Sequence, residues 1–316
     1  MGTITYRSKI YEDYRPNFIV VDPPTIDDWE GEKFDVYHEA AKLARRDWRD
    51  EFGASAVVID TATSLGNDLL QYVARAGLGR VKDPMILAAG DPVNRIVAPE
   101  MQDYGKAQDL LEALLRIWGT QPVHVFVLAH RGEVMKIVKV TERGQLKEFE
   151  HYGFKGPGEK MTKYAGGLFS QYTYLENIAG PSQPPSIRWR LTDTKDYRAK
   201  TRQLHAEAKP YIDLKWNQAD PVGNLAMLRN AHNQVARWHG IRWDAPRQTG
   251  LAGRTFWQCC YAQSGHGKTT LFTAFPEELF AAGPVIYLAY DPASVYMETT
   301  FPELLQAGKP TAQAGS

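Results

Sequence analysis

Residues 262–270 read AQSGHGKTT and make up most of a phosphate-binding loop. The full pattern is Gly, four residues, then Gly-Lys-Ser/Thr, because backbone N–H groups and a helix N-terminus must face the phosphates. Ala262 stands in place of the first glycine, whereas Gly267, Lys268 and Thr269 fit the pattern. An apolar stretch, TFWQCCYA, precedes the loop and a helical pattern follows it, which is the context that such a loop requires.

The loop predicts a site for the phosphates of a nucleotide. We expect Lys268 to contact the terminal phosphates and Thr269 to bind a Mg²⁺ ion. A chance glycine-rich turn beside a lysine is the alternative. The predicted nucleotide-binding residues are Gln263, Ser264, Gly265, His266, Gly267, Lys268, Thr269 and Thr270.

The loop lies too close to the end of the chain to begin a domain. After Lys268 there are only a helical pattern, one strand pattern, PVIYLAYD, and a tail. A nucleotide site also needs a carboxylate at the end of a neighbouring strand to hold Mg²⁺. Upstream, AVVIDTATS places four apolar residues before Asp60 and small hydroxyl residues after it. An apolar run that ends in Asp is common, but beside an incomplete site it predicts the acid on the metal side.

A circular permutation would join these parts. Reading from residue 251 to the C-terminus and then on from residue 1 gives the loop, a helix, a strand ending at Asp291, the Asp60 strand, a helix and a strand ending at His130. We therefore predict one α/β domain with a mostly parallel sheet flanked by helices and the phosphate loop near the C-terminus. The alternative is that residues 251–316 are a fragment completed by another chain.

The predicted organisation has four segments. They are 1–204, with the acid and most of the domain; 205–250, a basic and aromatic connection; 251–308, the loop part of the same domain; and 309–316, a disordered tail. Further predictions are a peripheral segment at 1–32 with one strand-like run at 17–22, helices at 34–52, 65–77, 103–119 and 268–283, a hairpin at 133–154, loops at 82–102 and 153–167, and a strand at 186–194.

Composition limits the partners and the compartment. The chain has 316 residues with 37 basic and 37 acidic side chains, so no overall field draws it to nucleic acid or to an anionic membrane. Its two cysteines, Cys259 and Cys260, are adjacent and lie in a strand pattern, which predicts reduced core thiols. No apolar run approaches the roughly 20 residues of a membrane span. We expect a soluble cytoplasmic protein with no membrane partner.

In the rotated order the chain resembles the RecA-like ATPases, and most closely phage nucleotide-binding recombination proteins of the Sak single-strand-annealing class. The resemblance covers most of the presumed core but neither residues 1–30 nor 205–250. It implies a RecA-like fold, Mg²⁺-dependent ATP hydrolysis and a homo-oligomer in the form of a ring or filament. The stretches that carry it are YAQSGHGKTTLFTAFP, VIYLAYD, VVIDTATSL, DYGKAQDLLEALLRIWGTQPVHVFVLAH and YRAKTR.

The resemblance also implies a role for particular residues. Asp60 would be the acid beside Mg²⁺, and Asp291 would polarise the attacking water, although the family usually has Glu there. His130 would sense the terminal phosphate. Lys200 and Arg202 would reach the site of a neighbouring subunit. The alternatives are a turn cap for Asp291, a structural role for His130 and a solvated basic run for the last two.

Two segments are candidates for contact with single-stranded DNA. Arginine can pair with phosphates, and tryptophan can stack on unpaired bases or simply lie in the core. The stretch 152–167 would be a mobile loop over a channel. The predicted contacts are Arg237, Trp238 and Arg242 in the segment 228–254, and Lys155 and Lys160 in the stretch 152–167.

The sequence thus predicts an oligomeric Mg²⁺-dependent ATPase that acts on single-stranded DNA in phage-type recombination or replication. One alternative is a phosphate-loop kinase of a small molecule, which would work as a monomer and release ADP only with its acceptor. The other is a nucleotide-regulated assembly or packaging component with slow turnover.

Overall fold

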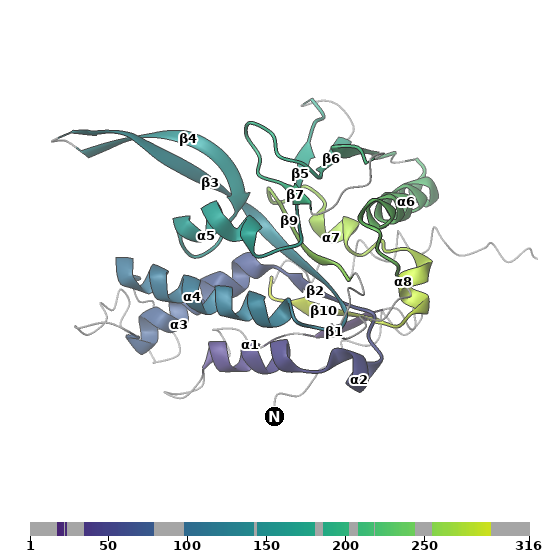
Figure 1. Ribbon diagram of the computed structural model, residues 1–316, viewed down its shortest axis with the longest axis horizontal. Helices are drawn as coiled ribbons and strands as arrows, with labels where there is room; N and C mark the ends of the chain where they lie inside the picture. The colour runs from purple at the N-terminus through teal and green to yellow at the C-terminus, as the bar shows by residue number, and fades with distance from the viewer. Residues whose placement is uncertain are drawn as a thin grey trace, which may run out of the picture.

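The structure is a computed structural model, and it describes most of the chain. The described residues are 18–21, 23, 35–78, 98–141, 144–180, 186–201, 208–217, 219–243 and 255–291. Within them, ten strands belong to one connected sheet (Figure 1). The strands are β1 (Phe18–Val21), β2 (Ala56–Asp60), β3 (His124–Thr141), β4 (Gly144–Phe154), β5 (Gln171–Asn177), β6 (Ser186–Arg190), β7 (Lys200–Thr201), β8 (Tyr211–Lys215), β9 (Trp257–Ala262) and β10 (Val285–Ala289).

The central part of the sheet is parallel. Its order is β1-β10-β2-β3-β9-β5-β6-β8, and every neighbouring pair from β1 to β5 is parallel. The pairs β5–β6 and β6–β8 are antiparallel, as are β3–β4 and β5–β7. All five residues of β2 are buried, as expected for a parallel strand that is covered on both faces.

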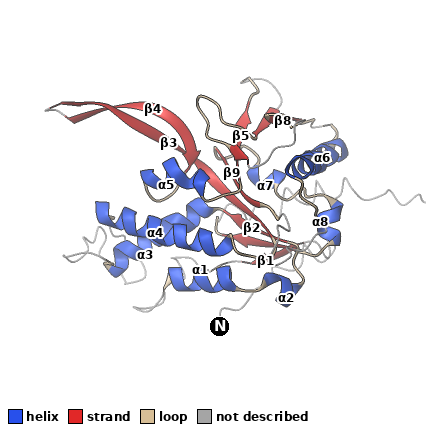
Figure 2. Ribbon diagram, in the orientation of Figure 1, coloured by secondary structure: helices blue, strands red, loops and turns tan. Residues whose placement is uncertain are grey.

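Helices cover both faces of the sheet (Figure 2). Because side chains alternate along a strand, Val57 packs with the core of α1, α3 and α4, whereas Val58 packs with the core of α6, α7 and α8. The predicted α/β class, with a mostly parallel sheet flanked by helices, is confirmed. The helices are α1 (Val36–Arg45), α2 (Trp48–Phe52), α3 (Ala62–Ala76), α4 (Met101–Trp118), α5 (Glu159–Tyr164), α6 (Pro221–His239), α7 (Lys268–Leu271) and α8 (Glu277–Ala281).

Several predicted elements need correction. The run at 17–22 is not peripheral, because β1 pairs with β10 and Val21 lies in the core. The helix predicted at 34–52 is divided into α1 and α2, since Asp47 is non-helical and its side chain caps the N-terminus of α2. The helix predicted at 268–283 is likewise divided into α7 and α8. Pro276 stands between them at the N-cap of α8, where its missing N–H costs no hydrogen bond.

The stretch 153–167 is not one continuous loop. It forms the end of β4, the helix α5 and a 3₁₀ turn at Ala165–Gly167. Gly156 is packed so closely that an added Cβ would lie 2.3 Å from Cγ of Met161. The predicted loop at 82–102 and the predicted tail at 309–316 fall largely or wholly outside the described residues.

A two-stranded arm extends from the body of the molecule (Figure 1). The strand predicted to end at His130 continues to Thr141, and its outer half pairs with β4. This part of β3, with β4, is called the arm below. The arm exposes a set of large apolar side chains, namely Ile137, Val138, Val140, Leu146 and Phe149.

Two further predictions concern the environment of the chain. Cys259 and Cys260 are buried and free, as predicted, and burial raises the pKa of the Cys260 thiol to about 12. Among the helices that the structure describes, none has the length and apolar character needed to cross a membrane.

Candidate nucleotide site

The predicted site residues meet at one edge of the sheet. Because β2, β3, β9 and β10 are parallel, their carboxyl ends lie on the same side. Ala262, the last residue of β9, pairs with His130 on β3. Asp60, the last residue of β2, pairs with Ala289 on β10. The phosphate loop, Asp60, His130 and Asp291 therefore all lie at the carboxyl edge.

Two glycines of the loop have an unusual backbone conformation. Gly265 and Gly267 have φ values of 77° and 75°, a left-handed region in which side chains are strained. Alternation of such conformations turns successive N–H groups toward one centre. Ala262 is still part of β9 and is fully buried, so the loop proper begins after it. The missing first glycine thus falls at a strand residue that needs no unusual backbone conformation.

The central contact of the site joins Thr269 to Asp60. The Thr269 hydroxyl donates a hydrogen bond of 2.8 Å to Oδ2 of Asp60, although the residues are 209 positions apart. Asp60 points to the face that α7 covers, as Val58 does two residues earlier. Sequence reasoning predicted that these two residues would lie within reach of one ion. The two side chains are in contact, and the ion stays a prediction.

Tyr287 is a member of the site that sequence reasoning missed. Its hydroxyl also donates to Oδ2 of Asp60. Tyr287 pairs with Val58 in the register of β10 and β2, so its ring lies on the same face as Asp60. The signal was present in the alternation of VIYLAYD, but it could be used only once the register of the two strands was known.

Burial sets the electrostatics of the two central charges. Burial raises the pKa of Asp60, and the hydrogen bonds from Tyr287 and Thr269 and the charge of Lys268 only partly oppose this effect. Burial also lowers the pKa of Lys268, which is 6% exposed, against the attraction of Asp60. Each group is therefore shifted toward its neutral form. A cation beside Asp60 and an anion beside Lys268 would each favour the charged form.

His130 and Asp291 form a second polar pair at the edge. Nε2 of His130 lies 3.5 Å from Oδ2 of Asp291, and both side chains are partly exposed. The backbone N–H of Asp291 donates to the carbonyl oxygen of Asp60 at 3.0 Å, which holds the backbone of Asp291 beside the acid. The backbone N–H of His130 donates to the Thr63 hydroxyl at 2.9 Å, and that hydroxyl donates to the carbonyl oxygen of Lys155.

Arg131 is a further cation that sequence reasoning did not assign. It follows His130, whose partner Ala262 immediately precedes the loop. Its guanidinium lies over the ring of Tyr152 at 4.1 Å. Burial lowers the pKa of His266 in the loop, and the charge of Arg131 adds to this effect. The loop is thus flanked by a positively charged group in addition to Lys268.

The pair of basic residues predicted to reach a neighbouring subunit, Lys200 and Arg202, is only partly described. Lys200 is half-buried on β7, and its Nζ donates to the carbonyl oxygen of Gly166 in the same chain at 3.4 Å. Arg202 lies outside the described residues. A reach of this pair into a neighbouring subunit stays a prediction.

The predicted DNA contacts fall in two places. Arg237 and Arg242 are exposed, but Trp238 is 5% exposed and belongs to the core, so its ring is not available for stacking on a base. Lys155 and Lys160 are exposed and lie at the end of β4 and on α5. The stretch that contains them includes the end of a strand and a helix, so the prediction of a continuous loop at this position is corrected.

The donor set around Asp60 fits Mg²⁺ only together with phosphates. In the parts of the chain that the structure describes, no group of three or more His, Cys, Asp or Glu side chains could hold a metal ion. The Thr269 hydroxyl and the Asp60 carboxylate supply two oxygen ligands. Mg²⁺ commonly binds one or two protein oxygens together with waters and substrate phosphates. The residues therefore fit an ion that arrives with a nucleotide, not a site that holds metal by itself.

Comparisons with known proteins add no assignment to this geometry. No family model, no curated protein and no solved structure matches the chain. The case for a function therefore rests on the loop, on the carboxylate bonded to it and on the sheet that brings the two together.

Proposed function

We propose that the chain is a circularly permuted RecA-like ATPase that binds ATP with Mg²⁺ at the carboxyl edge and hydrolyses it. The observation that carries this proposal is the hydrogen bond between Thr269 and Asp60. A chance glycine-rich turn would need no buried carboxylate beside the first hydroxyl of its helix. A nucleotide site requires both groups, from two different strands.

The strand order supports the permutation. Strand β10 lies between β1 and β2, and β9 lies between β3 and β5, so the upstream and downstream segments form one sheet. This arrangement argues against a fragment that is completed by another chain. From β9 the chain continues to β10, which lies on the β1 side of the sheet. From the neighbouring strand β5 it continues to β6, which lies on the β8 side. Open α/β sheets bind ligands at such a change of direction, beyond the carboxyl ends of the strands.

Each residue of the site would have a separate role in hydrolysis. Backbone N–H groups of residues 263–269 would hold the phosphates, and Lys268 would neutralise them. Thr269 and Asp60 would hold Mg²⁺, which when bound neutralises charge on the phosphate oxygens. Asp291 would orient the attacking water, with His130 beside it as the sensor of the terminal phosphate. Both side chains are partly exposed, so water can reach them.

We further propose that the protein acts as a homo-oligomer, and the arm supports this. Exposed apolar side chains at such density are typical of a contact surface. The charges of the arm are mixed, with Lys136, Lys139 and Lys147 near Glu133 and Glu148. Such a surface is complementary to itself and not to a polyanion. A second copy of the chain is therefore the expected partner of the arm, and Lys200 with Arg202 would act at the same interface.

The test is the rate of phosphate release with and without single-stranded DNA, across a range of protein concentrations. We expect Mg²⁺-dependent hydrolysis whose rate per chain rises with protein concentration. Lys268→Ala should abolish it, whereas Lys106→Ala, which removes an exposed lysine of α4, should not. Hydrolysis that persists in Lys268→Ala would refute the proposal. ADP release that requires a small acceptor molecule would instead identify a kinase.

A further inference from the structure

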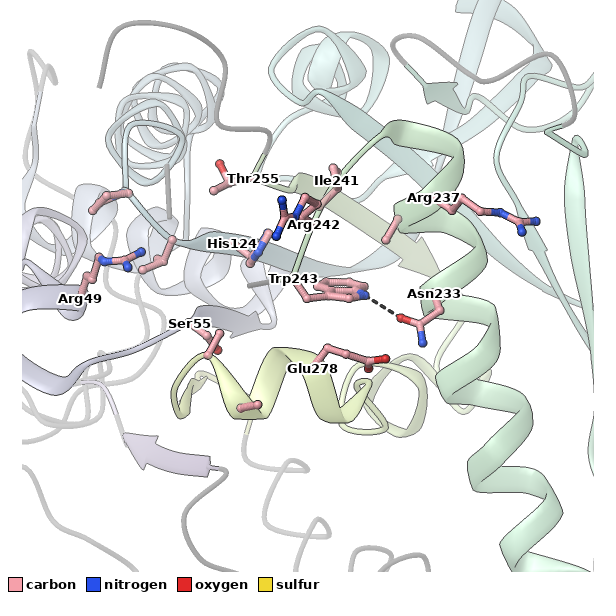
Figure 3. Close-up of a pocket in the computed structure, with 15 residues that line it drawn as sticks. Arg49, Ser55, His124, Asn233, Arg237, Ile241, Arg242, Trp243, Thr255 and Glu278 are labelled. Atoms are coloured by element: carbon pink, nitrogen blue, oxygen red, sulfur yellow. Dashed lines mark hydrogen bonds between the residues drawn. The ribbon is translucent and has the colours of Figure 1, made fainter. Parts of the chain in front are cut away.

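A cavity of about 840 Å³, whose lining residues are drawn in Figure 3, lies at the opposite edge of the sheet from the loop. Its lining includes Ser55, just before β2, His124, the first residue of β3, and Thr255, just before β9. These strands are parallel, so their amino ends lie at the edge that faces away from the phosphate loop. The cavity is therefore separate from the candidate nucleotide site.

Arginines dominate the charge of this cavity. Arg49, Arg237 and Arg242 line it, and Glu278 is the one acid among the described residues that do so. Arg49 and Arg237 form no ion pair with any residue that the structure describes. In Figure 3, Arg49 and Arg242 approach the space near His124 from two sides, whereas the guanidinium of Arg237 points outward from α6. Like charges gathered around a hollow create a local field that favours an anion.

His124 contributes a buried and uncharged side chain to the lining of the cavity. His124 is 2% exposed, and its Nδ1 accepts the backbone N–H of Phe256 at 3.0 Å. Burial lowers the pKa of His124 to about 4, so the ring is neutral near pH 7. The positive charge is thus supplied by guanidinium groups, which stay protonated at every working pH.

The tryptophan that lines the cavity, Trp243, cannot stack on a base. Trp243 is 7% exposed, and its Nε1–H donates to Oδ1 of Asn233 at 2.7 Å. Its ring packs against Phe256 and His124. The wall therefore offers shape but no free ring face to a base. A ligand held here would be recognised by its phosphates and not by its bases.

We propose that this cavity, with Arg49, Arg242 and Arg237, binds the phosphodiester backbone of a single-stranded nucleic acid. The guanidinium of Arg237 is directed away from the hollow, so only an extended ligand can contact all three side chains. This favours a nucleic-acid strand over a small phosphate. The choice of partner rests on the proposed RecA-like ATPase and on the expectation from the sequence that it acts on single-stranded DNA, but the location of the site does not. Strand and nucleotide would then bind at opposite edges of one sheet.

The experiment measures binding of a fluorescent oligo(dT) by anisotropy over a series of salt concentrations. Each Arg→Ala variant at positions 49, 237 and 242 should weaken binding. The plot of the logarithm of the binding constant against the logarithm of the salt concentration should become less steep, by about 0.7. The matched control is Arg116→Ala, which removes an exposed arginine of α4 and should change neither quantity. Arg49→Lys should keep the slope, because lysine retains the charge. Glu278→Gln should tighten binding by removing the opposing charge.

Two outcomes would overturn the inference. One is an unchanged salt slope in all three alanine variants. The other is displacement of the oligonucleotide by millimolar inorganic phosphate combined with no effect of Arg237→Ala, which would identify a site for a small phosphate. Phosphate release without DNA is measured on the same variants and should be unchanged. Strand binding that depends on these arginines, in a protein that does not hydrolyse ATP, would uphold the cavity and refute only the proposed function.

Discussion

The hydrogen bond between Thr269 and Asp60 makes a sharp prediction about energetic coupling. If both residues hold the same Mg²⁺ ion, removing either one should release the ion, and removing the second should cost little more. The perturbations are Thr269→Ala and Asp60→Asn, alone and together. Thr269→Ser keeps the hydroxyl and should keep most of the activity. Thr120→Ala removes an exposed hydroxyl at the end of α4 and is the matched control.

The expected magnitudes follow from the contact. Loss of one group that stabilises charge in the transition state costs about 2.7 kcal/mol, or roughly a hundredfold in kcat/KM. Independent roles would make the double variant about ten thousandfold slower. With a shared ion, the double variant would lose only about a hundredfold in kcat/KM. This corresponds to a coupling energy of about 2.7 kcal/mol between the two residues. The concentration of Mg²⁺ needed for half-maximal rate should rise in each single variant.

The assay is steady-state phosphate release at saturating and at limiting Mg²⁺, together with urea unfolding of the nucleotide-free protein. Thr269→Ala deletes a hydrogen bond of 2.8 Å to a buried carboxylate, so its free energy of unfolding should fall by about 2 kcal/mol. This loss is too small to explain a hundredfold loss of rate by unfolding. Additive effects of the two substitutions on kcat/KM would refute the shared ion and, with it, the main support for the site.

The remaining predictions concern the backbone, the histidines and the arm. Gly267→Ala, at φ 75°, should lower the free energy of unfolding by about 1 kcal/mol and raise KM for ATP, whereas Gly105→Ala in α4 should raise that free energy by about 0.5–1 kcal/mol; urea unfolding and phosphate release test both. The pKa values of His124 and His232 are lowered from 6.5 to about 4 by burial, so stability present above pH 6.5 is lost as the pH falls toward 4. From this shift, each histidine should cost about 2 kcal/mol at pH 5, and a free energy of unfolding that does not fall between pH 7 and pH 5 would contradict the assignment. Val140→Asp on the arm should lower the molar mass measured by light scattering, and Val222→Asp, an equally drastic change at an exposed site on α6, should not.

The parts of the fold that could be predicted from sequence have strong local patterns. Strands β2, β9 and β10 are short apolar runs bounded by turn residues, and their burial on both faces matches that pattern. The loop and Asp60 were predictable because each needs only its own strand. Their contact was predictable because parallel strands bring their carboxyl ends to one edge.

The parts that were missed depend on contacts between distant segments. Strand β5, QYTYLEN, is buried at its first five residues, but polar residues interrupt it and hide its place beside β9. The full length of β3 was missed because its inner half follows the pattern of a buried strand and its outer half that of an exposed hairpin. Tyr287 could be assigned only from the register of β10 with β2. The cavity brings together Arg49 and Arg242, which no sequence pattern connects.

Two buried charged groups at the candidate site lower the free energy of unfolding. Because the folded-state pKa of Asp60 is raised, the ionised carboxylate opposes folding once the pH exceeds its ordinary value of 3.8. Because the pKa of Lys268 is lowered, its ammonium group opposes folding at neutral pH. Their mutual attraction offsets part of both costs. A ligand that places a cation beside Asp60 and phosphates beside Lys268 would offset the rest, and at a hundred times its Kd it would stabilise the fold by about 2.7 kcal/mol. Such an arrangement is expected of a site that is shaped for a bound ion and its nucleotide rather than for the stability of the free chain.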